Sequence, residues 1–206
     1  MVSDVIYIIG AGGHGRVVAD ALSAAGVGQS RLVFRDGRPG LTLLGNAVAV
    51  PETSSDMAGS QFHVAVGSTA IRRRLYDAAI AVGALPLSVF HPASVIAAEA
   101  KFGHGILVAA TAVVAPGADV GDGTIVNHGA IVDHDVRVGS FCHIAPRAAL
   151  GGGVRIGDNV LVGAGAVILP GLNIVQGVTI GAGAVVTRSI IELGTWVGNP
   201  ARKLEK

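Results

Sequence analysis

Cysteine and charge are both scarce in this chain of 206 residues. The single cysteine, Cys142, cannot form an internal disulfide, and we expect a reducing, cytoplasmic location. Only 14% of the residues are Asp, Glu, Lys or Arg, and the formal net charge is +1. The longest basic run, Arg72–Arg74, fits a solvated helix face, so we do not expect nucleic-acid binding.

Long apolar runs are missing as well. Half of the residues are hydrophobic, yet no stretch reaches the roughly 18 residues of a spanning helix without a glycine, a proline or a charge. The opening segment Met1–Asp4 lacks the basic region that begins a signal peptide. We therefore expect neither membrane insertion nor export.

The second half of the sequence repeats every six residues. Each sixth position from 96 to 186 holds a bulky apolar residue: Ile96, Phe102, Val108, Val114, Val120, Val126, Val132, Val138, Ile144, Leu150, Ile156, Val162, Ile168, Ile174, Ile180 and Val186. This period is typical of a parallel β-helix. If each coil has three sides, residues eighteen apart stack on one another.

A second set of positions supports this fold. Two residues before most of the aliphatic sites stands a small residue, and residues i and i−2 share one face of a strand. Cys142 belongs to this set, so we interpret it as a core residue and not as a nucleophile. Glycine often follows the aliphatic site, where we expect it to allow tight bends and close approach of the coils.

The first half alternates short strands and helices. We expect strands at 5–9, 32–34, 62–66 and 87–90, and helices at 16–25 and 71–82. This order is typical of a parallel βαβ unit. The predicted fold is therefore a Rossmann-like α/β domain at 1–90, followed by an all-β parallel β-helix with a C-terminal tail at 91–206.

A glycine-rich loop follows the first expected strand. Gly10, Gly12 and Gly15 match the dinucleotide fingerprint, and Asp36 lies near the expected acidic position. Backbone N–H groups at such a helix N-terminus can hold a phosphate. A dinucleotide usually needs two such halves and only one fits here, which favours a single nucleotide or nucleotide sugar over NAD. A tight turn without a ligand stays open as the alternative.

The combined pattern resembles the bacterial sugar acyltransferases. That family includes sialic acid O-acetyltransferases and the N-acetyltransferases of nucleotide-linked amino sugars. The resemblance spans nearly the whole chain and rests on Gly10–Gly15, Val66–Gly67 with Arg72–Arg73 after it, His91–Ala93, Asn127–Asp135, His143–Pro146, Gly163–Gly171 and Gly198–Ala201. It implies a nucleotide-sugar-binding N-terminal domain, a left-handed β-helix that uses acetyl-CoA, and a homotrimer.

The resemblance also implies a reaction. The acetyl group would pass to the amino group of a nucleotide-linked 4-amino-4,6-dideoxy sugar, for surface-glycan biosynthesis. O-acetylation of a sialic acid or another sugar is the alternative within the family. The sugar, and the choice between UDP, GDP and CMP, stay open.

The resemblance assigns roles to particular residues. His134 would be the general base, and Asp135 would tune it. The acetyl-CoA contacts fall on His143, Gly152, Ala164 and Ala182, and the nucleotide-sugar contacts fall on Gly12, Gly13, His14, Asp36 and Gly67. Arg35 departs from the pattern, because relatives often carry two acidic residues here, and this puts the base or ribose contact in question.

The eighteen-residue coil places His134 directly under Gly152. His134 follows an aliphatic site by two residues, at a corner where adjacent side chains such as His134 and Asp135 can touch. Ala164 and Ala182 share a different corner, so we expect the site to lie between subunits. There, His134 would take a proton from the attacking amine or hydroxyl, while the Gly152 N–H supports the oxyanion.

Two functions of other classes stay open. A β-helix metalloenzyme similar to γ-type carbonic anhydrases needs three convergent ligands, but His104, His128 and His134 fall on three different corners, so we expect no metal. A non-catalytic nucleotide-sugar-binding protein would bind the sugar without consuming acetyl-CoA.

Overall fold

The computed structural model describes residues 4–205 and divides into two compact units, Met1–Pro92 and Ala93–Lys206. Residues 1–3, on which the expectation about a signal peptide partly rests, lie outside the described residues. Within residues 4–205, no helix has the length and apolar character that crossing a bilayer would demand.

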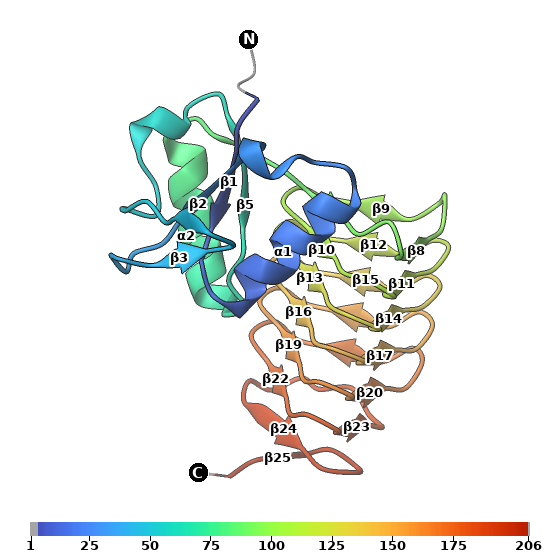
Figure 1. Cartoon of the computed structure of the whole chain (residues 1–206). Helices are drawn as coiled ribbons and strands as arrows, with labels where there is room; N and C mark the ends of the chain where they lie inside the picture. Colours follow the sequence, from blue (N-terminus) through green and yellow to red (C-terminus); the bar gives the residue numbers. More distant parts are fainter. Residues whose placement is uncertain (1–3, 206) are drawn as a thin grey trace. The chain divides into compact units, whose positions relative to one another are not determined.

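The first unit is built on a four-stranded parallel sheet in the order β2-β1-β5-β6 (Figure 1). Its elements are β1 Ile6–Ile9, α1 Gly13–Ala24, β2 Leu32–Arg35, β5 Gln61–Val64, α2 Thr69–Ala81, β6 Leu85–Pro86 and β7 Val89–Phe90. The central strand β1 is buried along its whole length, which explains its unbroken apolar sequence. Leu75 and Ala79 of α2 pack on the sheet face that carries Phe62 and Val64.

The expected βαβ order is confirmed, with three differences. Helix α1 begins at Gly13, three residues before the predicted start, because Gly12 already serves as its N-cap. The strand predicted at 87–90 is confirmed only at Val89–Phe90, which is β7, and the pairing with β5 belongs to an earlier strand, β6, that begins at Leu85. The hairpin β3 Thr42–Leu43 and β4 Asn46–Ala47, and the 3-10 turns Gln29–Arg31 and Ser55–Met57, were not predicted.

The second unit is the predicted left-handed parallel β-helix, which confirms the fold class. Residues eighteen apart pair, as in Val114 with Val132. One sheet holds β8 Val95–Ile96, β11 Val113–Val114, β14 Ile131–Val132, β17 Ala149–Leu150, β20 Val167–Ile168 and β23 Val185–Val186. The second holds β9 Lys101–Phe102, β12 Asp119–Val120, β15 Arg137–Val138, β18 Arg155–Ile156 and β21 Asn173–Ile174. The third includes β10 Leu107–Val108, β13 Ile125–Val126, β16 His143–Ile144, β19 Leu161–Val162, β22 Thr179–Ile180, β24 Thr195–Val197 and β25 Arg202–Lys203.

The interior of the β-helix is filled by the second residue of each short strand and by the small residue two positions earlier. Val132 and Ala130, for example, are both fully buried. Cys142 is buried in the same cluster, and its Sγ lies 3.1 Å from the carbonyl oxygen of Gly157. The prediction that Cys142 is a core residue is confirmed.

The corners have a regular backbone. The residue three positions after an aliphatic site takes a positive φ, both where it is glycine, as at Gly117, and where it is Asp135 (φ 59°). The glycines directly after the aliphatic sites serve close approach instead: a Cβ on Gly121 would lie 2.7 Å from the carbonyl carbon of Gly139. Close approach was predicted correctly, but the left-handed residue of each bend lies two positions further on.

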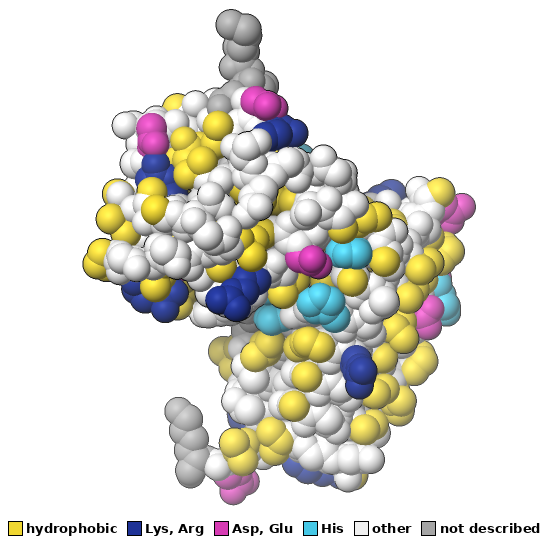
Figure 2. Space-filling view, in the orientation of Figure 1, with side chains coloured by type: hydrophobic (Ala, Val, Ile, Leu, Met, Phe, Trp, Pro, Cys, Tyr) yellow, Lys and Arg dark blue, Asp and Glu magenta, His cyan; other side chains and the backbone are white. Residues whose placement is uncertain are grey.

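The outward residues of two sheets differ in character. The sheet from β8 to β23 presents apolar side chains throughout, namely Val95, Val113, Ile131, Ala149, Val167 and Val185. The sheet from β9 to β21 presents Lys101, Asp119, Arg137, Arg155 and Asn173. Val95 is 63% exposed and Ile131 42% exposed, and apolar atoms follow this edge of the β-helix in Figure 2. We call Val95, Val113, Ile131, Ala149, Val167 and Val185 the apolar face.

Candidate functional site

His134 and Asp135 form a pair on one corner of the β-helix, directly after β14. Nδ1 of His134 lies 2.9 Å from Oδ2 of Asp135. Consecutive side chains can meet because Asp135 takes the left-handed backbone conformation. Both side chains are well exposed, at 62% and 74%. When Nδ1 is protonated and donates a hydrogen bond to Asp135, Nε2 keeps its lone pair and can accept a proton from a ligand.

The charge around His134 favours its protonated form. The hydrogen bond to Asp135, with a further contribution from the charge of Asp133, raises the pKa of His134 above that of an ordinary histidine. Asp133 also fixes the backbone, because its Oδ1 accepts the N–H of His134 at 2.7 Å. The carboxylates of Asp133 and Asp135 therefore both position His134 and raise its pKa.

Gly152 lies one coil away from His134, against its ring. A Cβ built on Gly152 would overlap Nε2 of His134, so the ring occupies space that any side chain at 152 would need. The N–H of Gly153 donates to the carbonyl oxygen of His134 at 2.9 Å, which fixes the two coils relative to each other. Within residues 4–205 the N–H of Gly152 donates no hydrogen bond, and it is open to an acceptor on a ligand.

The other residues predicted to contact acetyl-CoA lie after or on strands of a different sheet. Ala164 follows β19 and Ala182 follows β22, and the N–H of Gly183 donates to the carbonyl oxygen of Ala164 at 2.8 Å. His143 stands in β16, and its Nε2 lies 3.1 Å from Nδ2 of Asn127. The structure thus groups His134, Asp135 and Gly152 on one corner and Ala164 with Ala182 on another.

Asn127 was not assigned a role from the sequence. It is buried, and besides contacting His143 its Oδ1 accepts the N–H of His128 at 2.8 Å. An amide directly after an aliphatic site, at a position where glycine is frequent, is the sequence signal that could have identified it.

The glycine-rich loop lies at the carboxyl end of β1 in the first unit. Gly10 has φ 111°, and a Cβ there would lie 2.7 Å from the carbonyl oxygen of Ala65. A Cβ on Gly12 or Gly13 would meet no atom of residues 4–205 within 4 Å. Gly13 and His14 open α1, whose N-cap Gly12 brings no side-chain hydrogen bond. The surface beside Gly12 and Gly13 is therefore open at the start of α1, where a helix N-terminus can bind an anion.

Asp36 holds this loop in place. Its Oδ2 accepts the N–H of Ala11 at 2.9 Å, and its Oδ1 accepts Nε of Arg38 at 2.9 Å. The hydrogen bond from Arg38, assisted by the backbone N–H groups, lowers the pKa of Asp36 to about 2. Gly67 follows β5, next to β1 in the sheet, and its carbonyl oxygen accepts Nη1 of Arg72 at 2.9 Å. Gly12, Gly13, Asp36 and Gly67 thus gather at the carboxyl ends of three adjacent strands.

The side chain of Arg35 does not enter this loop region, although its carbonyl oxygen accepts the N–H of Gly10 at 2.7 Å. Its guanidinium is ion-paired with Asp56, donates to the carbonyl oxygen of Pro51 at 3.1 Å and lies 5.2 Å from the ring centroid of Tyr7. Only Asp36 occupies the acidic position, so the departure noted in the sequence reflects a structural ion pair.

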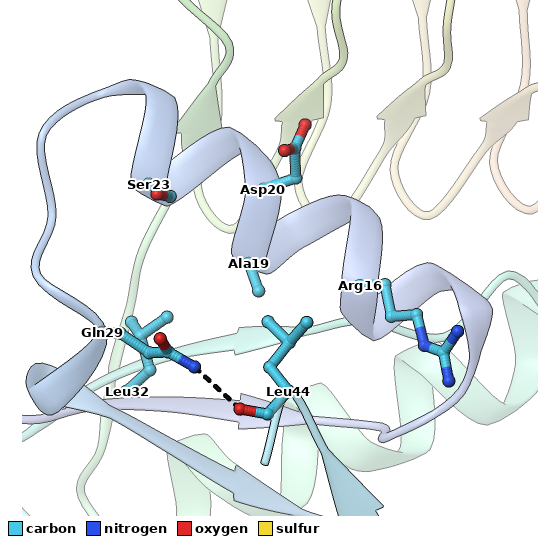
Figure 3. A pocket seen from close by; sticks show the side chains of 7 residues that line it. All are labelled: Arg16, Ala19, Asp20, Ser23, Gln29, Leu32 and Leu44. Carbon is cyan, nitrogen blue, oxygen red and sulfur yellow. Dashed lines mark hydrogen bonds between the residues drawn. The ribbon is translucent and has the colours of Figure 1, made fainter. Parts of the chain in front are cut away.

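A cavity of about 320 Å³ lies elsewhere on the first unit, beside α1 (Figure 3). It is lined by Arg16, Ala19, Asp20, Ser23, Gln29, Leu32 and Leu44, and Nε2 of Gln29 donates to the carbonyl oxygen of Leu44 at 2.9 Å. Its lining comes from the flank of the helix and from strand ends away from the glycine-rich loop, so we do not assign it to the nucleotide. Among residues 4–205, no three His, Cys, Asp or Glu side chains converge to hold a metal ion.

Two family models match parts of the chain. The model of the PglD N-terminal domain matches residues 5–79, and that of the bacterial transferase hexapeptide (six repeats) matches residues 135–170. A comparison with curated protein sequences finds no match.

Solved structures match nearly the whole chain. The acetyltransferase domain of PglB from Neisseria gonorrhoeae is 38% identical, with a TM-score of 0.91 over 98% of this chain and 100% of that one, and it has also been solved with acetyl coenzyme A. PerB from Caulobacter crescentus, solved with CoA and GDP-perosamine, is 33% identical, with a TM-score of 0.91 over 98% of this chain and 97% of that one. A mutant GDP-perosamine N-acetyltransferase from the same organism is 32% identical, with a TM-score of 0.93 over the same shares of the two chains.

Proposed function

This chain belongs to the hexapeptide-repeat sugar acyltransferases, and from this premise we propose that it acetylates the amino group of a nucleotide-linked 4-amino-4,6-dideoxy sugar. Acetyl-CoA is the co-substrate. The observation that carries the proposal is the His134–Asp135 pair lying against Gly152, whose N–H is open to a ligand. It joins a base to a carbonyl-binding donor, the two groups that acyl transfer to an amine requires.

His134 acts as the general base. The sugar amine forms a bond to the thioester carbonyl carbon while Nε2 of His134 takes the proton that the amine loses. The C–S bond then breaks, and the proton can pass from His134 to the departing thiolate. Asp135 stabilises the protonated ring through its 2.9 Å contact with Nδ1.

Gly152 supplies the donor for the oxyanion. Gly152 lies against the ring of His134, so a carbonyl oxygen bound to its N–H would bring the carbonyl carbon close to the base. Such a backbone donor typically contributes a few kcal/mol to transition-state stabilisation. Glycine suits this position because the ring of His134 leaves no room for a Cβ.

The first unit binds the nucleotide. The diphosphate binds at the start of α1, beside Gly12 and Gly13 and next to His14, where the helix dipole favours negative charge. Asp36 orders the loop and contacts the ribose side, and Gly67 closes the site from the β5 end.

The active particle is a homotrimer with its sites between chains. His134 with Gly152 occupies one corner and Ala164 with Ala182 another, so one chain alone does not unite the base with the proposed CoA contacts. The apolar face supports self-association, since exposed contiguous apolar surface commonly marks an interface. Threefold closure would cover this face equally on every chain.

The cytoplasm and surface-glycan biosynthesis are the proposed cellular setting. Acetyl-CoA is a cytoplasmic metabolite, and the lone buried Cys142 is compatible with a reducing compartment.

The direct test is release of free CoA thiol with a panel of UDP-, GDP- and CMP-linked amino sugars, with a sialic acid as the O-acetylation arm. Acetylation of a nucleotide-linked amino sugar, identified by mass spectrometry, is the expected result. Turnover of sialic acid alone would replace the proposal with O-acetylation, and binding without thiol release would indicate a non-catalytic protein.

Gly13→Val is expected to raise KM for the nucleotide sugar at least tenfold and to change the affinity for acetyl-CoA little. A Cβ at 13 meets no atom of residues 4–205 within 4 Å, so we expect the fold to tolerate valine, which would fill the space where a phosphate reaches the backbone. Steady-state kinetics in each substrate measure both effects.

Gly15→Val is the contrasting variant for Gly13→Val. A Cβ at 15 would overlap the carbonyl oxygen of Gly10, so this change should damage the domain itself and lower its melting temperature. If Gly13→Val also weakened both substrates equally and lowered the melting temperature, the loop would be structural and not a phosphate site.

A further inference from the structure

A cavity of about 240 Å³ opens beside the glycine-rich loop, within the first unit. Gly10, Asp36, Gly37 and Arg38 line one part of it, Glu52 another, and Val66, Ile71 and Leu75 supply an apolar wall. In parallel sheets ligands bind at the carboxyl ends of the strands, where β1, β2 and β5 end here. If the loop holds the diphosphate, as the proposed function requires, this cavity is where the nucleobase lies.

The polar groups of the cavity are not equally available. Asp36 and Arg38 are engaged with each other through the 2.9 Å contact between Oδ1 and Nε, and Asp36 also accepts the N–H of Ala11. Within residues 4–205, Glu52 has one ion-pair partner, Arg74, at 3.8 Å, and the Arg74 side chain is 67% exposed. The carboxylate of Glu52 therefore keeps most of its capacity to accept hydrogen bonds.

Glu52 is held at the wall by the local backbone. A Cβ built on Gly37 would lie 2.6 Å from Oε1 of Glu52, so the carboxylate rests against a residue that has no side chain. The Glu52 side chain is 31% exposed, which leaves it reachable from the cavity but partly shielded from water. A carboxylate in this position is a directional acceptor and not a mobile surface charge.

A carboxylate with two free oxygens distinguishes among nucleobases. Guanine presents two adjacent donors, N1–H and the N2 amino group, which match the two oxygens. Uracil presents one N–H between two carbonyl oxygens, which a carboxylate repels. Cytosine and adenine each place an amino group beside a ring nitrogen that is itself an acceptor. The apolar wall of Val66, Ile71 and Leu75 suits the flat face of any base and does not discriminate.

We propose that Glu52 makes this protein select a guanine nucleotide, with its carboxylate accepting hydrogen bonds from N1–H and the N2 amino group of the base. The proposal deepens the proposed function by naming the nucleotide of the sugar donor. Neither Arg35, which is paired with Asp56, nor Asp36, which orders the loop, is available for that role.

The test is calorimetric titration of the full chain with GDP, IDP and UDP. IDP carries hypoxanthine, which lacks only the N2 amino group of guanine. The wild-type protein is expected to bind GDP about tenfold or more tightly than IDP or UDP, since a hydrogen bond to a charged group typically contributes that much. Glu52→Gln should weaken GDP binding by about tenfold or more, bring the GDP-to-IDP ratio close to one and leave UDP nearly unchanged.

Glu99→Gln, an exposed glutamate of the β-helix, is the matched control and should change none of the three affinities. Wild-type protein that binds UDP or IDP as tightly as GDP would overturn the proposal without any variant. Glu52→Gln that weakens GDP and UDP equally would overturn it too. Measurements of binding and of turnover distinguish failure of the guanine selection from failure of the proposed reaction. Acetyl transfer to a UDP-linked amino sugar without guanine preference would contradict only the guanine selection. Guanine selection without acetyl transfer would contradict only the proposed reaction.

Discussion

Replacing His134 with alanine is expected to lower kcat by about 100-fold or more while the β-helix stays folded. Nε2 of the imidazole lies against Gly152, and general-base removal typically costs two to four orders of magnitude. The side chain is 62% exposed and fills no core space, so stability should change little. Thiol-release kinetics and a thermal melt measure the two effects.

The pH dependence of kcat/KM is a second test of His134 as the general base. Since Asp135 raises the pKa of His134, the catalytically competent neutral form should appear only above the ordinary histidine value of about 6.5. The acid limb of kcat/KM should therefore lie above that value, and Asp135→Asn should move it to lower pH.

His104→Ala, at a corner after β9, is the matched control for His134→Ala and should keep full activity. A His134→Ala enzyme with near-wild-type kcat at neutral pH would rule out the base.

The β-helix could be predicted in detail because every coil buries residues of the same kind at the same positions. Each side buries one bulky and one small residue at fixed positions, so the period appears in the sequence and the eighteen-residue register follows from it. That register alone predicts that His134 lies next to Gly152, as it does. The left-handed position at each corner could not be predicted, because Asp135 takes a conformation there that glycine takes elsewhere.

The contacts made by the loops of the first unit were harder to predict from the sequence. The glycine-rich loop and Asp36 carry a recognisable spacing, but residues 37–60 have no period to indicate which of them return to the site. Arg35 finds its partner Asp56 twenty-one residues later, and Glu52 reaches Gly37 across the hairpin β3–β4. Both contacts depend on tertiary packing that local propensity does not encode.

Ile131→Glu is expected to convert the proposed homotrimer to monomers and to abolish turnover. Ile131 lies in the middle of the apolar face, between Val113 and Ala149 on the adjacent strands, and is 42% exposed in the single chain. A glutamate there would have to be buried without a partner, which costs several kcal/mol at each of the symmetry-related interfaces. Light scattering should report a mass near the 20.5 kDa of one chain, and not three times that value.

Arg137→Glu is the matched control for Ile131→Glu. Arg137 occupies the equivalent outward position on the next sheet, in β15, where the neighbouring outward residues are Asp119 and Arg155. This variant should stay trimeric and active. A wild-type protein that is monomeric at full turnover would contradict the trimer, and an Ile131→Glu trimer would show that the apolar face is not the interface.

Whether the sites are shared between chains can be decided by mixing two inactive variants. His134→Ala removes the base, and Ala164→Trp blocks the corner that carries Ala164 and Ala182. If each site joins the His134 corner of one chain to the Ala164 corner of the next, every mixed trimer contains one interface with both halves intact. Random mixing in equal amounts should then restore about a quarter of wild-type turnover. If both corners serve a site within one chain, no chain in the mixture is intact, and verified mixed trimers should stay as inactive as their parents.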